Sequence, residues 1–201
     1  MKNIAVLASG RGTNFEAIAK AVKRGFIRAK LKLLITDKEN AGVRERAKKF
    51  AVKDIFIDPR NFKSRQDFDR EVVRILKKEK INLVVLAGFM RIITPYFVKA
   101  FKNRILNIHP AILPSFKGVG AIERAYNYGV KVTGITVHFV DEGVDTGPII
   151  LQEALKIREK ESLQSLEERI HKLEHRLYPL AVKLFSEKRL KIKGRKVEIK
   201  A

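Results

Sequence analysis

The chain has 201 residues, of which 45% are hydrophobic, and it carries a formal net charge of +21. This length and composition suffice for one α/β domain with a substantial apolar core. The sequence contains no cysteine, which excludes disulfides, thiolate metal ligands and a cysteine nucleophile. The first apolar segment is too short for a signal peptide or a membrane span, so we expect a soluble cytoplasmic protein with no membrane partner.

The positive charge is spread along the chain. Its 43 Lys and Arg residues are interleaved with Asp and Glu on predicted helix faces such as 67–80, as is typical of solvated surfaces. The densest basic segment, 188–201, has apolar residues alternating around Gly194 and predicts a β-hairpin with one wet face. No aromatic residues are interleaved there for base stacking, so we expect no specific nucleic-acid partner. A basic nucleic-acid-binding module without catalysis remains the alternative of a different class.

Apolar strands and amphipathic helices alternate through the first half of the chain. In order, we predict strand 4–8, helix 15–23, strand 31–36, helix 43–50, strand 55–58, helix 65–78 and strand 83–87. This alternation predicts a doubly wound, mostly parallel α/β sheet. The wholly apolar run 83–86 is typical of a central strand that helices cover on both faces.

The pattern changes after Ile105. A strand ending at His109 is followed by a loop with Pro and Gly to Gly120, and then by a short helix at 121–128. The runs 131–140 and 148–157 predict an antiparallel hairpin added to the parallel sheet. Apolar residues three and four apart from Leu163 to Leu184 predict one amphipathic helix that packs on the sheet, with Pro179 removing one backbone hydrogen bond.

The turn after the first strand reads Ser-Gly-Arg-Gly-Thr-Asn at positions 9–14. In a doubly wound sheet this turn lies at the carboxyl end of a strand, where glycines and free helix N–H groups form a phosphate cradle. The turn lacks the third glycine of a dinucleotide fingerprint and the lysine of a Walker loop. Thr13 and Glu16 also have the spacing of a capping box, a reading that is compatible with the cradle.

Asn107 and His109 end the strand that begins at Ile105. Residues two apart on a strand project to one face, so the amide and the imidazole would lie side by side. This pair could stabilise an oxyanion and move a proton near neutral pH. Asp145 lies in an acidic hairpin turn, which the turn backbone alone would explain. If that turn folds over the strand, Asp145 would pair with His109 and raise its pKa.

Other chemistries are less well supported. Ser115 lacks the Gly-x-Ser-x-Gly sequence of a nucleophile elbow, so a hydrolytic triad is not expected. His138 sits in the middle of a predicted strand, which favours a buried, hydrogen-bonded histidine. His171 and His175 are four apart on a helix, but the four histidines show no convincing metal-ligand spacing, and we predict no metal.

Together these segments resemble the phosphoribosylglycinamide formyltransferases, the folate-dependent glycinamide ribonucleotide transformylases of purine biosynthesis. The resemblance runs from the first strand to about Phe185 and implies a Rossmann-like formyltransferase fold. It rests on Ser-Gly-x-Gly-Thr-Asn at 9–14, Leu-Ala-Gly-Phe-Met-Arg at 86–91, Asn-Ile-His-Pro-Ala-Ile-Leu-Pro at 107–114, Thr-Val-His-Phe-Val at 136–140, Asp-Thr-Gly-Pro at 145–148 and Glu-His-Arg-Leu-Tyr-Pro at 174–179.

The resemblance implies transfer of a formyl group from 10-formyltetrahydrofolate to the amine of glycinamide ribonucleotide. The residues implied to hold the substrate phosphate are Gly12, Thr13 and Asn14, with Glu174 near the rest of that substrate. The residues implied to contact the folate are Arg65, Met90, Arg91, Ile92, Ile93 and Asn107. The implied catalytic residues are Asn107, His109 and Asp145.

We therefore expect one formyltransferase domain over 1–201, with a phosphate-binding half at 1–100, a catalytic and folate-binding half at 101–187 and a basic tail hairpin at 188–201. A homodimer is possible. Many relatives carry a histidine at or near the position of Ile122, which leaves the substrate contacts of the 115–122 loop open. The alternatives are formyl transfer to another amine such as initiator methionyl-tRNA, or hydrolysis of 10-formyltetrahydrofolate. Enzymes with those activities carry additional domains that we do not find in these 201 residues.

Overall fold

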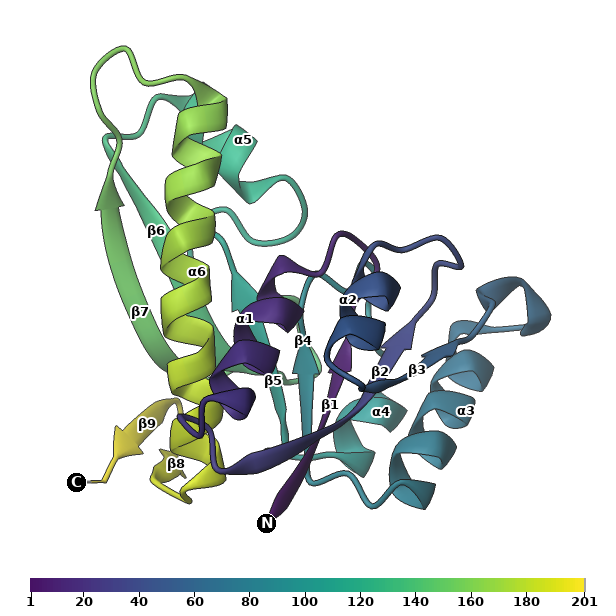
Figure 1. Cartoon of the computed structure of the whole chain (residues 1–201). Helices are drawn as coiled ribbons and strands as arrows, with labels where there is room; N and C mark the ends of the chain where they lie inside the picture. The colour runs from purple at the N-terminus through teal and green to yellow at the C-terminus, as the bar shows by residue number, and fades with distance from the viewer. Residues whose placement is uncertain (201) are drawn as a thin grey trace.

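Within residues 1–200, nine strands form one continuous sheet in the order β3-β2-β1-β4-β5-β6-β7-β9-β8 (Figure 1). The computed structural model describes residues 1–200. The strands are β1 (Lys2–Leu7), β2 (Ala29–Thr36), β3 (Lys53–Phe56), β4 (Leu83–Leu86), β5 (Ile105–His109), β6 (Val132–Phe139), β7 (Ile149–Lys156), β8 (Leu190–Lys193) and β9 (Lys196–Ile199). The helices are α1 (Thr13–Lys23), α2 (Val43–Lys49), the 3₁₀ helix η1 (Pro59–Asn61), α3 (Arg65–Lys78), α4 (Pro95–Ala100), α5 (Ala121–Tyr128) and α6 (Leu163–Ser186).

The strand pairing confirms the predicted fold class. Strands β3, β2, β1, β4 and β5 pair in parallel, whereas β6 pairs antiparallel with both β5 and β7. The tail forms the predicted antiparallel hairpin, with β8 paired to β9. The structure adds that this hairpin continues the sheet, because β9 pairs in parallel with β7 at Lys196 and Ile149.

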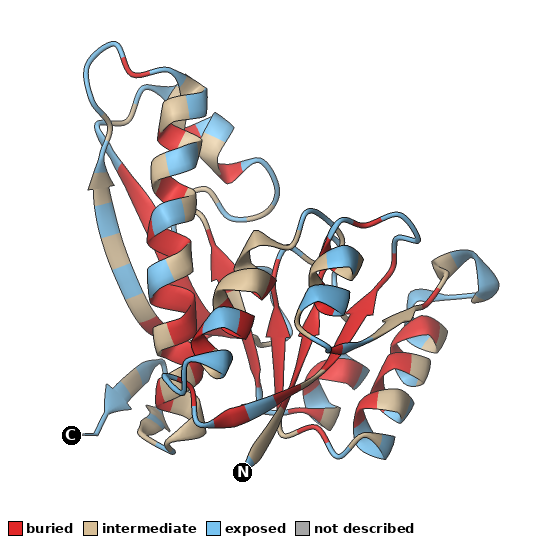
Figure 2. Cartoon of the chain, viewed as in Figure 1, coloured by how far each residue is buried: buried red, intermediate tan, exposed pale blue. Residues whose placement is uncertain are grey.

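Helices cover both faces of the sheet, as Figure 1 shows: α1, α2 and α6 lie on one face and α3 and α4 on the other. Alternate residues of β1 supply the two layers. Ile4 and Val6 pack in the α1–α6 layer, whereas Ala5 and Leu7 pack in the α3–α4 layer, because successive strand side chains point to opposite faces. Figure 2 shows the resulting buried residues on the central strands and on the inner sides of the helices.

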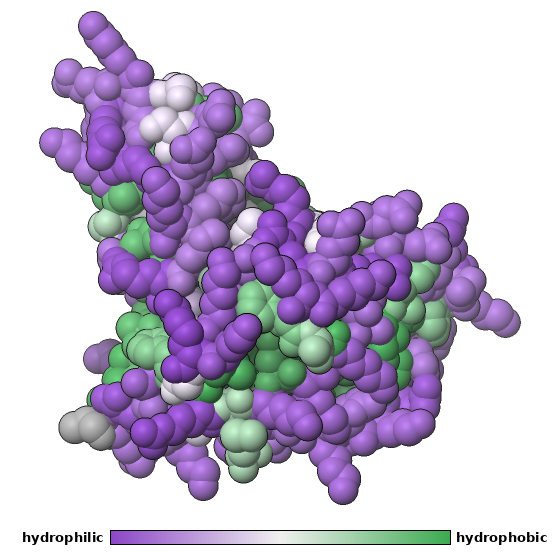
Figure 3. Space-filling model, viewed as in Figure 1, coloured by the Kyte–Doolittle hydropathy of each residue, from purple (hydrophilic) through white to green (hydrophobic). Residues whose placement is uncertain are grey.

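The outer surface of the α1–α6 layer is mostly hydrophilic (Figure 3). Apolar side chains show in patches, mostly across the lower half of this view. Among residues 1–200, no helix combines the length and the apolar character that crossing a bilayer requires. The buried apolar residues of α1, α3 and α6 belong to the two core layers that cover the sheet.

The predicted capping box of the first helix is wrong. Gly12 is the N-cap residue of α1, and no side chain caps this helix end. Gly12 has φ +77°, and a Cβ atom there would lie 2.4 Å from Cγ2 of Val43. Glu16 pairs instead with Lys20 at 2.8 Å and with Arg46. The packing of α2 against the turn thus requires glycine at position 12. The role of the turn as a phosphate cradle stays a prediction.

Two short helices, η1 and α4, were not predicted from the periodicity. Helix α4 has six residues, too few to show an amphipathic repeat. A local signal was present, however, because Thr94 is the N-cap residue and Pro95 follows it at the first helical position. Pro95 therefore indicates the start of α4 more clearly than the apolar pattern does.

Tyr178 joins the long helix α6 to the centre of the sheet. Helix α6 continues through Pro179 and brings the fully buried Tyr178 against two strands. The Tyr178 hydroxyl lies 2.7 Å from the carbonyl oxygen of Leu86 in β4 and 3.0 Å from that of Leu106 in β5. This contact holds together the two strands that carry the candidate site.

We predict that Tyr178→Phe lowers the free energy of unfolding by about 1–3 kcal/mol, because it removes the shared donor of two carbonyl groups in the interior. Urea denaturation followed by circular dichroism measures this loss. Tyr128→Phe is the matched control, since Tyr128 is 80% exposed, and we expect it to change the stability little. Equal stability of the two variants would contradict the role assigned to the Tyr178 hydroxyl.

Candidate active site

A cleft of about 800 Å³ opens over the carboxyl ends of β1, β4 and β5. This is where doubly wound sheets bind ligands. Six segments line it: the turn 9–14, the segment 86–93, the end of β5 at 107–110, the loop 118–121, the strand end and turn 138–145, and residues 171 and 174 of α6. The structure therefore brings the predicted phosphate turn, folate segment and catalytic residues to one cleft.

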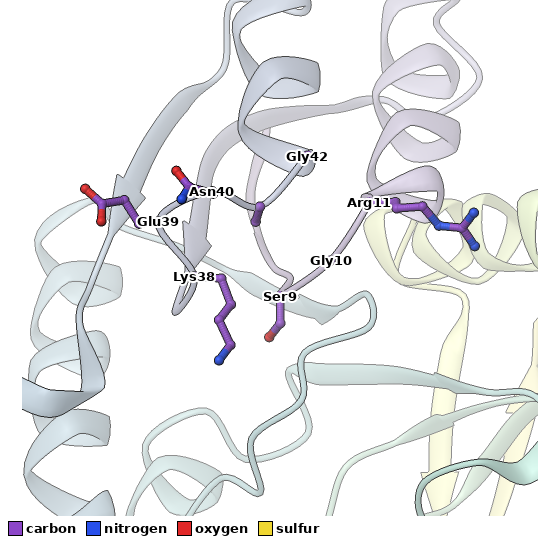
Figure 4. Close-up of a pocket in the computed structure, with 8 residues that line it drawn as sticks. Ser9, Gly10, Arg11, Lys38, Glu39, Asn40 and Gly42 are labelled. Carbon is purple, nitrogen blue, oxygen red and sulfur yellow. The ribbon is translucent and has the colours of Figure 1, made fainter.

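A second hollow, of about 470 Å³, lies on the other side of the turn (Figure 4). It is lined by Ser9, Gly10 and Arg11 and by the loop 38–42 that follows β2. In Figure 4 the Lys38 and Ser9 side chains lie near one another, whereas Arg11 points away from Lys38 toward α6. Arg11 thus extends toward the larger cleft, which it also lines.

Asn107, His109 and Asp145 meet in the larger cleft. Asn107 Nδ2 donates to Asp145 Oδ1 at 3.2 Å, and His109 Nδ1 lies 3.3 Å from Asp145 Oδ2. Both β5 residues contact the same carboxylate, so the predicted projection to one face is confirmed. The predicted folding of the acidic turn over the strand is also observed, with Asp145 in the left-handed region at φ 51°.

His138 belongs to this cluster, although its position in the middle of a strand predicts only a buried, hydrogen-bonded histidine. Its Nε2 atom lies 3.2 Å from Asn107 Nδ2 and 3.5 Å from Asp145 Oδ1, and its Nδ1 atom lies 2.8 Å from the carbonyl oxygen of Phe139. His138 is buried as predicted, but it also lines the cleft. It stands opposite Asn107 in the β5–β6 register. Only that register reveals its place, because opposite residues of an antiparallel pair share a face.

The loop after β5 closes around the cluster. Gly118 N donates to Asp145 Oδ2 at 2.8 Å, and the carbonyl oxygen of Phe116 lies 2.9 Å from His109 Nε2. Arg124 of α5 donates to the same Phe116 carbonyl at 2.9 Å. Ile122 packs against the α1–α6 core layer. The loop thus contacts the cluster through backbone groups.

A second polar cluster surrounds the phosphate turn. Asn14 Nδ2 donates to Glu174 Oε2 at 3.0 Å, and His171 Nδ1 lies 3.0 Å from the same oxygen. The hydrogen bond to Glu174 raises the pKa of His171, although burial opposes this. Asn14 Oδ1 is buried and finds no hydrogen-bond partner within residues 1–200. Asn14 and Glu174 were predicted site residues, whereas His171 was not predicted to line the cleft.

The segment 90–93 forms the opposite wall of the cleft. Met90, Arg91, Ile92 and Ile93 all line the cleft, and the apolar side chains of Met90 and Ile92 are more than half exposed. Exposed apolar residues in a cleft are typical of a ligand-binding wall. Arg65 lies at the exposed start of α3 and is not part of the cleft lining, so its contact with the folate stays a prediction.

Comparisons with known proteins agree with this geometry. A sequence profile described as formyl transferase matches residues 2–182. The phosphoribosylglycinamide formyltransferase of Bacillus subtilis (strain 168) is 45% identical, over 91% of this chain and 94% of its own length.

Solved structures show the same likeness. Glycinamide ribonucleotide transformylase 1 from Symbiobacterium toebii is 45% identical, with a TM-score of 0.98 over 100% of this chain and 95% of its own. The phosphoribosylglycinamide formyltransferase from Bacillus halodurans is 48% identical, with a TM-score of 0.88 over 90% of this chain and 94% of its own. The chain belongs to the formyl transferase family. The resemblance inferred from the motifs is thereby confirmed.

The pKa of His109 in this formyl transferase corrects one expectation. Burial lowers this pKa, and nearby His138 and Arg124 lower it further, whereas the Asp145 carboxylate and the Phe116 carbonyl raise it. Burial outweighs the two acceptors, so the net shift is downward. The predicted Asp145 contact is present, but the expected net rise of the His109 pKa is wrong.

Asp145 is held as an anion. Burial alone would raise its pKa, but hydrogen bonds from His138 and from Gly118 N–H, together with the nearby His109, lower it to about 2. Asp145 is therefore ionised throughout the physiological range, and it offers a fixed negative charge beside the His109 ring. Neither here nor elsewhere in residues 1–200 is a group of three or more acidic or histidine side chains arranged to hold a metal ion.

We predict that Asp145→Asn lowers the pKa of His109 below its value in the unchanged protein. The substitution keeps the side-chain size but removes the negative charge that stabilises the protonated ring. Histidine NMR titration measures the shift. His171, whose pKa depends first on Glu174, serves as the control in the same spectra and should move little. A His109 midpoint that stays in place or rises would contradict the assignment.

Proposed function

We propose that this chain transfers the formyl group of 10-formyltetrahydrofolate to the amine of glycinamide ribonucleotide in purine biosynthesis, in the cytoplasm. The meeting of Asn107, His109 and Asp145 between the phosphate turn and the 90–93 wall is the observation that carries this proposal. The two walls provide sites for two different substrates, with the polar cluster between them. The close relatives of known activity support the same reaction.

The phosphate turn suits the ribonucleotide. The left-handed Gly12 brings the first backbone N–H groups of α1 to the cleft, where they attract an anion. Arg11 adds positive charge, and the hydrogen bond to Glu174 raises the pKa of His171, which favours its protonated form. Glu174 is held by Asn14 and His171 and offers a carboxylate for the hydroxyl or amine groups of the same substrate. We assign Gly12, Thr13, Asn14 and Glu174 to this substrate.

The opposite wall suits the folate. Its exposed apolar side chains, Met90 and Ile92, and the half-buried Ile93 offer contact area for a flat heteroaromatic ring, and Arg91 adds a cation. We assign 90–93 to the folate and place its formyl group near Asn107. The formyl carbon would then face the amine of the ribonucleotide across the cleft.

The chemistry follows from the central cluster. The substrate amine attacks the formyl carbon and forms a new C–N bond, while negative charge develops on the formyl oxygen. The Asn107 amide and the protonated His109 ring stabilise this oxyanion. Collapse of the tetrahedral intermediate breaks the bond to the folate nitrogen, and the proton lost by the amine passes to that nitrogen through His109 or a water molecule. No acyl-enzyme is formed.

The lowered pKa of His109 fits a proton-transfer role. A ring with a lowered pKa gives up its proton more readily, while the ionised Asp145 stabilises the protonated form during turnover. A substrate atom that hydrogen-bonds to His109 Nε2 replaces the carbonyl of Phe116, which occupies that position here. Asp145 then keeps the ring oriented through Nδ1.

We predict that His109→Ala lowers kcat for formyl transfer to glycinamide ribonucleotide by about 10²–10⁴-fold, because the oxyanion and the proton lose their partner. Absorbance of the folate product measures the rate. Ser115→Ala is the matched control: Ser115 is exposed in the loop beside the cluster, and the reaction uses no serine nucleophile. A large loss in that control, or near-normal activity of His109→Ala, would contradict the mechanism.

The +21 charge favours one second candidate, formyl transfer to the amine of initiator methionyl-tRNA. The same assay with charged tRNA, and with no acceptor, separates tRNA formylation and hydrolysis from the proposed reaction. Turnover of 10-formyltetrahydrofolate with glycinamide ribonucleotide as acceptor, and with neither of the other two conditions, supports the proposal. Formylation of the tRNA alone, or folate hydrolysis at the same rate without an acceptor, would overturn it.

We also predict that Asn14→Asp raises KM for glycinamide ribonucleotide about tenfold or more, since a carboxylate there repels both the phosphate and Glu174. KM for 10-formyltetrahydrofolate should change little. Asn40→Asp adds the same charge in the neighbouring hollow and is the matched control. If both variants raised KM for glycinamide ribonucleotide equally, the effect would come from the added negative charge at long range, and the assignment of the phosphate to the turn would be contradicted.

A further inference from the structure

A buried carboxylate lies behind the folate wall. Asp69 of α3 is 3% exposed, and its carboxylate contacts Thr94 at the start of α4. Burial raises its pKa, and donors from Thr94 together with the charges of Arg91 and Arg65 oppose that rise. Because burying an acid is costly unless it is compensated, the contacts of Asp69 indicate what it does.

One oxygen of Asp69 accepts both donors of Thr94. Thr94 N lies 2.6 Å and Thr94 Oγ1 lies 2.7 Å from Asp69 Oδ2. Thr94 directly follows the wall 90–93 and is the N-cap residue of α4. The carboxylate therefore fixes the end of the wall at the point where the chain turns into a helix.

The residue beside Asp69 holds the middle of the same wall. The guanidinium carbon of Arg91 lies 4.5 Å from the centre of the Phe68 ring, a cation–π arrangement. The start of the wall is held by Ser9, whose N–H donates to the Gly88 carbonyl at 3.0 Å and whose Oγ accepts from Met90 N at 2.9 Å. The segment 88–94 is thus fixed at its start, middle and end.

We propose that Asp69 is a positioning residue for the folate wall. Through Thr94 it fixes the backbone of 90–93, and with Phe68 it directs Arg91, so that the wall is in place before the folate arrives. Preorganisation of this kind contributes to affinity by lowering the cost of ordering a segment. The inference rests on the proposed function in one respect, namely that this wall takes the folate and not the ribonucleotide.

The test compares Thr94→Val, which removes one donor and retains the N–H, with Thr94→Ser, which restores the hydroxyl, and with Asp69→Asn. We expect Thr94→Val and Asp69→Asn to raise KM for 10-formyltetrahydrofolate about tenfold. KM for glycinamide ribonucleotide should stay within about twofold, and Thr94→Ser should restore the folate KM. Calorimetry with tetrahydrofolate gives Kd independently of turnover and should show the same order of variants.

Thr133→Val is the matched control. Thr133 is also buried, in β6, and its hydroxyl has no hydrogen-bond partner within residues 1–200, so the same substitution there should leave both KM values and Kd unchanged. Thermal denaturation of every variant measures how far Thr94 and Asp69 contribute to stability, separately from their effect on folate binding.

The outcomes separate the inference from the proposed function. Lower thermal stability with an unchanged folate KM, or an equal rise of both KM values, would show a merely structural Asp69 and overturn the inference while the activity stands. If the unchanged chain transferred no formyl group, the proposed function would fail, and the Kd for tetrahydrofolate would still test Asp69. Absence of tetrahydrofolate binding to the unchanged chain would overturn both.

Discussion

The candidate site depends on one half-buried negative charge. Asp145 remains ionised, with a pKa of about 2, only because His138, Gly118 N–H and His109 compensate its burial. These partners come from β6, from the loop after β5 and from β5 itself. The carboxylate therefore holds three segments of the chain together while it orients the His109 ring. A neutral group at this position would leave the donors without their shared acceptor, which is costly in the interior of a protein.

Local patterns predicted most of the fold because they depend on near neighbours in the sequence. The 3.6-residue period identified the bounds of α3, and the two-residue spacing on β5 placed Asn107 and His109 on one face. The failures involve contacts between distant segments. Val43 of α2 packs so closely on the turn that position 12 must be glycine, and Gly12 takes the N-cap position in place of the predicted capping box. Likewise, only the β5–β6 register places His138 beside Asn107. Neither contact leaves a local signature in the sequence.

The pKa of His109 shows a second kind of limit. The sequence indicated the sign of the neighbouring charge, because Asp145 was expected beside the ring, and that contact exists. It did not indicate how deeply the strand end is buried once the loop 116–118 and the 145 turn pack over it. Burial and a neighbouring carboxylate act on an imidazole in opposite directions, so the net direction depends on depth, a property of the complete fold.

The charge of the whole chain and the charges of its cleft play separate roles. The chain carries +21, yet the ionisable side chains that line the cleft include four acids, Asp141, Glu142, Asp145 and Glu174, and two arginines, Arg11 and Arg91. Long-range positive potential raises the encounter rate with anionic substrates, whereas the few groups within the cleft determine their orientation. Substituting lysines on the outer surface should therefore change encounter rates and their salt dependence, while the cleft groups govern turnover. In this formyl transferase, net charge predicts the kind of ligand that is attracted, and local geometry predicts what is done with it.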